Sequence, residues 1–163
     1  MTYTPILATL LRGRMNADRG GTLPIHVVKR VVDEAGSALE RIDLFNYGEP
    51  FLYRHLVEAL RYIRVKTPFA KIAISTDGLQ VRPSIEATIV DQRLLDWIIF
   101  SVDGVDQDTY GRYRIRGCFD HAFRNMVRFN ERARHGYCGD LAVRRIPMER
   151  HRHAPAASDD NGG

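Results

Sequence analysis

Short apolar runs alternate along the chain with longer stretches in which apolar residues recur every three or four positions. The runs lie at 42–46, 71–75 and 97–102, and a cluster of small polar residues follows each of them. Runs of this length are typical of buried strands, and the intervening stretches are typical of amphipathic helices. The pattern predicts βα units, whose parallel strands place their carboxyl ends at one common edge.

Four helices are expected beside these three strands. Pro24 and Pro50 suit the first turn of a helix, Gly36 suits the position just after one, and Pro68 cannot continue one. The helical stretches are therefore expected at about 24–36, 50–67, 84–93 and 119–134. The fold class that follows is α/β, with parallel strands and outer helices.

Three regions are expected along the chain. Residues 1–21 lack a clear period and predict an irregular lead-in, whereas 22–140 form the core domain. A run at 141–143 would make a poor fourth strand, because two arginines and Pro147 follow it closely. From there to residue 163 the composition is polar and rich in small residues, so we expect 141–163 to be a disordered tail.

Composition narrows the class of protein. Of 163 residues, 44% are hydrophobic and 27% are charged, which is ordinary for a globular domain. A net charge of +4 permits binding to anions without requiring it. Two cysteines do not make a disulfide framework, and the apolar run near the start is too short to cross a bilayer. We therefore expect a cytoplasmic protein without a membrane partner.

Four polar motifs follow the strands in a fixed order. They are Asn-Tyr-Gly-Glu-Pro-Phe-Leu at 46–52, Ser-Thr-Asp-Gly at 75–78, Ser-Val-Asp-Gly at 101–104, and Thr-Tyr-x-x-Tyr-Arg-x-x-Gly-x-Phe-Asp at 109–120. Each motif alone is weak, but the ordered set across residues 40–130 resembles the radical S-adenosylmethionine (SAM) enzymes. It is most similar to the branch that often carries a C-terminal SPASM extension.

The resemblance implies a fold and a chemistry. The fold is a partial (β/α) barrel, in which the carboxyl ends of the strands hold SAM beside a [4Fe–4S] cluster. Three cysteines in a C-x3-C-x2-C loop bind that cluster in the family. Reduction then yields a 5′-deoxyadenosyl radical that abstracts a hydrogen atom from the substrate, so the cofactor carries the reaction.

The resemblance also implies a set of cofactor-binding residues, and it assigns no catalytic residue or metal ligand in this chain. The motif after the first strand supplies groups for the SAM ammonium, the next two supply hydroxyls and carboxylates for the ribose and the methionine moiety, and an arginine faces the methionine carboxylate. The set is Gly48, Glu49, Ser75, Thr76, Asp77, Ser101, Asp103 and Arg114.

Three departures from the family pattern matter. Tyr47 replaces the first glycine of a Gly-Gly-Glu-Pro motif, and Asp77 replaces an asparagine. The third is larger, because the chain has no C-x3-C-x2-C loop, and its two cysteines, Cys118 and Cys138, both follow the last expected core strand. We therefore interpret the chain as a fragment, truncated at both ends and inactive alone, which leaves its status as an enzyme open. The substrate is not indicated.

Simpler interpretations of the same residues stay open. Glu49 could cap the helix that starts at Pro50, and the Ser and Asp residues could be ordinary turn formers. The chain could then be a non-catalytic α/β scaffold or a nucleotide-binding interaction protein. A doubly wound sheet would carry helices on both faces, whereas a barrel carries them on one.

Two further interpretations have less support. Cys118 and His121, with His135 and Cys138, have zinc-like spacings, but an unbroken helix would hold the two pairs roughly 20 Å apart. Arginines at 124, 128 and 132 form a stripe that we expect to be a solvated face. Arg112, Arg114 and Arg116 alternate with Tyr113 and Ile115, a pattern that could indicate a nucleic-acid surface. Because no stacking platform of aromatic residues accompanies this pattern, we do not expect a nucleic-acid partner.

Overall fold

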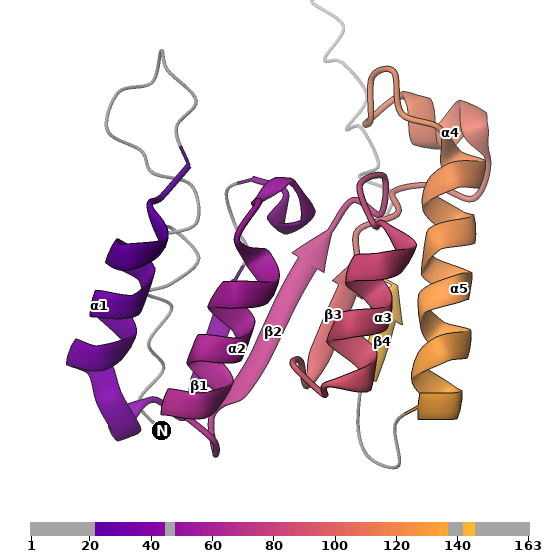
Figure 1. The fold of residues 1–163 in the computed structure, drawn as a ribbon. Coiled ribbons are helices and arrows are strands. Elements are labelled where there is room, and N and C mark those ends of the chain that lie inside the picture. Colours follow the sequence, from indigo (N-terminus) through magenta and orange to yellow (C-terminus); the bar gives the residue numbers. More distant parts are fainter. Residues whose placement is uncertain (1–21, 45–47, 137–141, 146–163) are drawn as a thin grey trace, which may run out of the picture.

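The core of the protein is one parallel sheet of four strands in the order β1-β2-β3-β4 (Figure 1). The computed structural model describes residues 22–44, 48–136 and 142–145. The strands are β1 (Arg41–Leu44), β2 (Lys71–Thr76), β3 (Trp97–Phe100) and β4 (Ala142–Arg145). All three pairings are parallel, which confirms the predicted α/β class.

The fourth strand corrects the sequence-based expectation of three strands. β4 runs parallel to β3, with Trp97 opposite Ala142 and Phe100 opposite Arg145. β4 is the last strand of the described sheet, and a strand at the edge of a sheet tolerates polar residues. The expected tail is therefore wrong for 142–145, whereas 1–21 and 146–163 lie outside the described residues. The division into three regions stays a prediction.

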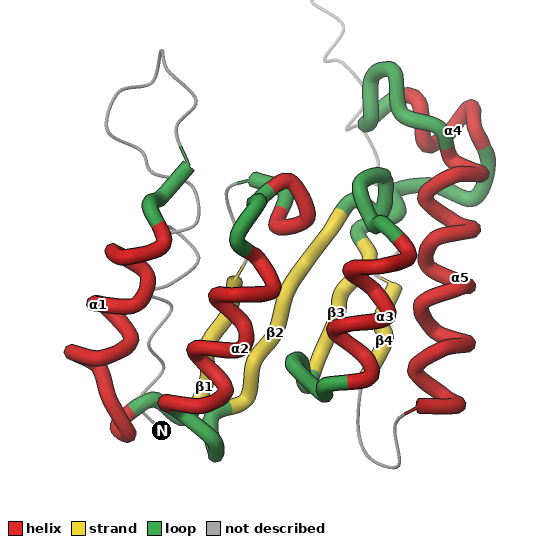
Figure 2. The backbone as a smooth tube through the Cα atoms, in the orientation of Figure 1, coloured by secondary structure: helices red, strands yellow, loops and turns green. Residues whose placement is uncertain are grey.

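All four expected helices are present (Figure 2): the first precedes β1, and the other three each lie between two successive strands. They are α1 (Ile25–Ala35), α2 (Leu56–Lys66), α3 (Pro83–Asp91) and α5 (Phe119–Gly136). The sequence analysis missed a short helix, α4 (Gln107–Gly111), which a capping box between Asp106 and Thr109 starts. A short 3₁₀ turn, η1 (Gly36–Ala38), follows α1.

The beginnings of two helices differ from expectation. Pro24 is the residue that caps α1 rather than part of its first turn. Pro50 begins a 3₁₀ turn, η2 (Pro50–Leu52), and α2 starts only at Leu56. Leu52 is therefore 65% exposed instead of lying on the buried stripe. The cause is local, because Glu49 binds the backbone N–H of Phe51 and turns the chain before the helix can begin.

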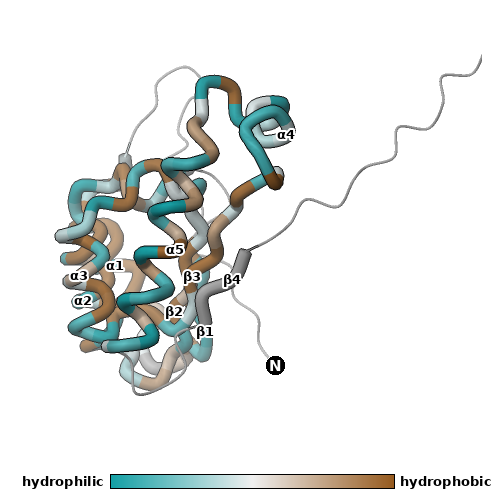
Figure 3. The backbone as a smooth tube through the Cα atoms, turned by 90° about the vertical axis from the view of Figure 1, so that its right-hand side faces the viewer, coloured by the Kyte–Doolittle hydropathy of each residue, from teal (hydrophilic) through white to brown (hydrophobic). Residues whose placement is uncertain are grey.

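The helices cover one face of the sheet. Figure 3 shows the long helices on one side and the strands on the other. Alternate strand residues enter the same buried cluster as the inner faces of the helices: Ile42, Leu44, Ile72, Ile74, Ile98 and Phe100 with Val28, Val32, Leu60, Ile63, Ile89 and Phe129. The sequential strand order and single helical layer differ from the doubly wound alternative for the described residues. No helix in these ranges is long and apolar enough to cross a bilayer.

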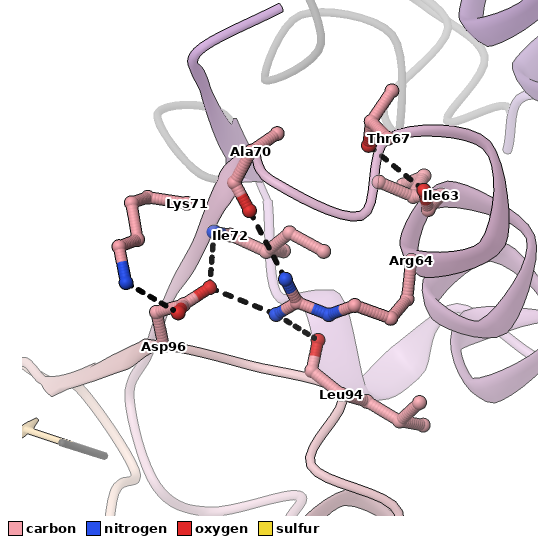
Figure 4. Close-up of polar contacts among 8 residues, drawn as sticks. All are labelled: Ile63, Arg64, Thr67, Ala70, Lys71, Ile72, Leu94 and Asp96. Atoms are coloured by element: carbon pink, nitrogen blue, oxygen red, sulfur yellow. Dashed lines mark hydrogen bonds and ion pairs between the residues drawn. The ribbon is translucent and has the colours of Figure 1, made fainter. Parts of the chain in front are cut away.

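A polar cluster joins the strands at their amino ends (Figure 4). Asp96 accepts hydrogen bonds from Arg64 Nη2 at 2.8 Å, from the Ile72 backbone N–H at 2.8 Å and from Lys71 Nζ at 3.2 Å. Burial raises the pKa of Asp96, but the bonds from Arg64 and Ile72 outweigh it and leave the pKa below its ordinary value. Asp96 thus ties β2 to the segment that enters β3.

Replacement of this carboxylate should destabilise the fold. We expect Asp96→Asn to lower the free energy of unfolding by about 2 kcal/mol at neutral pH, because Arg64 loses its ionic partner. The pKa of Asp96 is lower in the folded protein than in the unfolded chain. The ionised Asp96 therefore stabilises the fold above the unfolded-state pKa of 3.8, and this stabilisation is lost as the pH falls below that value. Urea titrations at pH 7 and pH 3 measure the difference.

A matched control is Asp91→Asn. Asp91 is 63% exposed and lies 3.8 Å from Arg132, so its loss should cost less than about 0.5 kcal/mol. Equal stability of Asp96→Asn and the wild type at pH 7 would contradict the role assigned to Asp96.

Candidate functional site

A hollow of about 490 Å³ lies where β1, β2 and β3 end. Its lining consists of Gly48, Glu49, Ser75, Thr76, Asp77, Ser101 and Arg114. All seven belong to the set of eight predicted from the sequence, and only Asp103 is outside the lining. We call this feature the rim hollow. Its volume falls in the range of small-molecule pockets.

The strand register brings the second and third motifs together. Thr76 pairs with Phe100 at the end of the β2–β3 ladder, and the Ser101 N–H donates to the Thr76 carbonyl at 2.8 Å. The hydroxyls of Ser75 and Ser101 then lie 3.0 Å apart and share a hydrogen bond. Two serines 26 residues apart in sequence therefore form one polar floor.

Glu49 joins the first motif to the second. Its Oε1 accepts hydrogen bonds from the Phe51 N–H at 3.0 Å and from Thr76 Oγ1 at 2.8 Å. Its Oε2 accepts one from the Asp77 N–H at 2.8 Å. The capping interpretation of Glu49 is thus correct for the 3₁₀ turn. The bonds to β2 add a second role, because they fix the loop after β1 against the end of β2.

The environment of Glu49 changes its acidity. Burial raises the pKa of Glu49 to about 7, and the nearby Asp77 adds to this, while the bonds from Phe51, Asp77 and Thr76 favour the ionised form. The carboxyl group therefore changes its charge near neutral pH. A cation that enters the rim hollow would favour the ionised form.

Asp77 has a structural role as well as a place in the hollow. Its Oδ1 accepts a hydrogen bond from the Leu79 N–H at 2.8 Å, which is the turn-forming interaction that the simpler interpretation expects. Gly78, the next residue, has a φ of +80°, a conformation that L side chains rarely adopt. Asp77 therefore both forms this turn and lines the rim hollow.

Asp103 and Arg114 form an ion pair at the side of the rim hollow. Oδ2 of Asp103 lies 2.9 Å from both Nε and Nη2 of Arg114. Arg114 lines the rim hollow, whereas Asp103 contacts Arg114 and is not part of the lining. The predicted ligand role of Asp103 is therefore not the arrangement that the geometry favours, and sequence spacing alone gave no sign of this pairing.

The charges in the rim hollow suit a mixed ligand. Two carboxyl groups, from Glu49 and Asp77, and one guanidinium, from Arg114, line it together with three hydroxyls. Carboxylates accept from ammonium groups, and an arginine fork pairs with a carboxylate. A zwitterion that carries an additional positive charge matches this set.

The described residues do not supply the ligands of an iron–sulfur cluster. Such a cluster requires several cysteine thiolates, and the one cysteine in these ranges, Cys118, is exposed. No group of three His, Cys, Asp or Glu side chains in the same ranges could hold a metal ion. The helix α5 is continuous from Phe119 to Gly136, so it separates His121 from His135 by roughly 20 Å at 1.5 Å per residue. Cys138 lies outside the described residues.

Arg124 and Arg132 of the arginine stripe on α5 are exposed, as expected of a solvated face, but two members of the stripe also pair with a carboxylate on α3. Arg128 Nε lies 2.7 Å from Oε2 of Glu86, and Arg132 Nε lies 3.3 Å from Oε1 of the same group. Glu86, on α3, is completely buried, so its charge needs these partners. The stripe joins α3 to α5, which its spacing alone could not show.

Comparisons with known proteins do not assign this chain to a family. The chain matches no protein-family model and no curated protein sequence. Among solved structures, it resembles the crystal structure of BtrN in complex with AdoMet and 2-DOIA, with 18% sequence identity and a TM-score of 0.47. The match covers 78% of this chain and 46% of BtrN, so the chain spans about half the length of that protein. At this level of similarity, the geometry of the rim hollow carries the functional argument.

The acidity of Glu49 predicts a pH dependence of stability. The folded protein holds the proton of Glu49 more tightly than the unfolded chain does, because the folded-state pKa is raised. The stabilising effect of this proton on folding is therefore complete below the unfolded-state pKa of 4.5 and is lost as the pH rises to about 7. Over this window we expect the wild type to lose on the order of 3 kcal/mol relative to Glu49→Gln. Parallel denaturation series of both proteins measure the difference in slope.

Glu34→Gln is the matched control, because Glu34 lies on the surface of α1 and is 64% exposed. Its stability profile should run parallel to that of the wild type between pH 4.5 and 7. If the Glu49→Gln profile also runs parallel, Glu49 does not titrate as the structure indicates.

Proposed function

We propose that this chain is a SAM-binding α/β domain of the radical SAM type, in which the rim hollow holds SAM. One observation carries the proposal: residues from four separate sequence motifs line a single hollow of about 490 Å³. The single layer of helices and the sequential strand order support a segment of a (β/α) barrel. The sheet would be one arc of that barrel.

Charge complementarity supports SAM as the ligand. SAM carries an ammonium group, a sulfonium group and a carboxylate. Glu49 and Asp77 offer acceptors for the cations, and Arg114 offers a fork for the carboxylate. Ser75 and Ser101 offer hydroxyls within reach of ribose hydroxyls at the same rim. The proposed binding roles of the seven lining residues rest on this match.

The chemistry of such a domain depends on its cofactors. In the family that this chain resembles, SAM would supply a 5′-deoxyadenosyl group for hydrogen abstraction, and a [4Fe–4S] cluster would supply the electron for that chemistry. Because the described residues do not fit that cluster, we expect this chain to bind SAM without turning it over. What the residues themselves do is bind, orient and neutralise the charges of the methionine moiety. Membership of the SPASM-associated branch and a cytoplasmic location belong to the same proposal.

One observation favours a second candidate, a non-catalytic scaffold. Glu49 already accepts three hydrogen bonds from within the protein. A carboxylate with this many internal donors can serve the fold alone, as in the helix-capping interpretation. Ligand binding separates the two candidates.

Isothermal titration of the chain with SAM tests the proposal. We expect saturable binding at one site, and we expect Glu49→Ala to weaken it roughly tenfold or more, because a charge-assisted contact is lost. Affinity for SAM should rise as the pH increases through 7, since the ionised Glu49 attracts the ligand cations.

Two controls make the titration specific. Glu34→Ala removes an exposed carboxylate far from the rim and should bind SAM like the wild type. S-adenosylhomocysteine lacks the sulfonium charge, so it should bind about fivefold more weakly than SAM. If neither the wild type nor its variants bind SAM, the scaffold candidate replaces the proposal.

A further inference from the structure

Arg114 reaches the rim hollow from an unusual place. It belongs to the link between α4 and α5 rather than to the end of a strand. A long side chain on a loose link would lose much of its freedom on binding a ligand. The contacts of residues 103–119, which we call the arginine arm, therefore decide whether Arg114 is held in place in advance.

Asp103 fixes the direction of the guanidinium. Its Oδ2 binds Nε and Nη2 of Arg114, each at 2.9 Å, and the side chain of Asp103 is only 18% exposed. A guanidinium has five N–H donors, and these two contacts use one on each nitrogen. The three remaining donors are one on Nη2 and two on Nη1. Within the described part of the chain, the end of the fork is thus available for a second carboxylate in the bidentate arrangement that arginine favours.

Tyr110 fixes the backbone of the arginine arm. Its side chain is completely buried, and its carbonyl accepts the N–H of Arg114 at 2.9 Å. A Cβ atom on Gly104 would meet the Tyr110 nitrogen at 2.6 Å, and one on Gly117 would meet Tyr110 Cε1 at 2.7 Å. Both glycines are therefore required by close packing, and the arm closes around the tyrosine ring.

Hydrogen bonds also hold the two ends of the arginine arm together. Asp106 and Thr109 form the capping box that starts α4. Gln107 donates from Nε2 to the Gly117 carbonyl at 3.0 Å and accepts from the Phe119 N–H at 2.9 Å. These bonds join the start of the arm to the first residue of α5, so the arm has a defined shape without a ligand.

We propose that Asp103 is a positioning residue that presents Arg114, on an arm preformed around Tyr110, as a receptor for the α-carboxylate of an amino-acid ligand. This inference rests on the proposed function and deepens it, because it names the residue and the preformed arm that hold Arg114 in place for the carboxylate. Asp103 then acts through Arg114 and does not touch the ligand.

The test compares SAM with its decarboxylated form, S-adenosylmethioninamine, which keeps the ammonium and sulfonium charges. By isothermal titration, we expect the wild type to prefer SAM by roughly tenfold, the effect of one charge-assisted bidentate pair. Asp103→Ala should lose most of this preference while its affinity for the decarboxylated ligand stays within about twofold. Asp103→Asn keeps one acceptor oxygen and should restore part of the preference.

Asp108→Asn is the matched control, because Asp108 is an exposed carboxylate on the same arm. It should keep the full preference for SAM. Equal weakening of both ligands by Asp103→Ala would overturn the inference, because it would indicate a general structural role. A wild type that binds both ligands equally would overturn it and leave SAM binding intact, whereas a wild type that binds neither would overturn the proposed function as well.

Discussion

The parallel register of β1, β2 and β3 is the constraint on which the candidate site depends. Alternate strand residues, such as Ile74 and Phe100, enter the buried cluster beneath the helices, so a shift by one residue would move the whole apolar set to the other face. This requirement fixes where each strand ends, and it therefore fixes which polar residues meet at the rim. At the amino ends of the strands, Asp96 accepts a hydrogen bond from the Ile72 N–H and so helps to fix the same register. The geometry of the rim hollow is a consequence of how the core packs.

Glu49 shows how structure and ligand binding can compete for one group. Its three internal hydrogen bonds hold the loop after β1 against β2, and burial raises its pKa to about 7. A buried carboxyl group near its pKa gains most from a cation nearby, because the cation offsets the cost of the ionised form. A ligand with a positive charge would therefore strengthen the join between β1 and β2. Arg114, which Asp103 holds in advance, offers the opposite charge on the other side of the hollow.

The sequence could predict much of this arrangement, because the relevant signals are local. Strand runs, helix periods and the polar motifs at 46–52, 75–78, 101–104 and 109–120 predicted seven residues that do line one hollow. The features that the sequence did not predict depend on tertiary contacts. β4 forms by backbone pairing with β3, which its polar residues do not predict. The contact of Asp103 with Arg114 depends on the shape of the arginine arm. Glu86 is completely buried only because two arginines 42 and 46 residues away pair with it.

Amide chemical-shift mapping by NMR tests the central claim most directly, because it reports on each strand end separately. The chain is labelled with nitrogen-15 and titrated with SAM. The account predicts that the backbone signals of Glu49, Asp77 and Ser101 move together along one binding curve, while that of Lys71, at the amino end of β2, stays in place. Signals that respond at only one strand end, or that move chiefly at the amino ends, would contradict a single SAM site shared by the three strands.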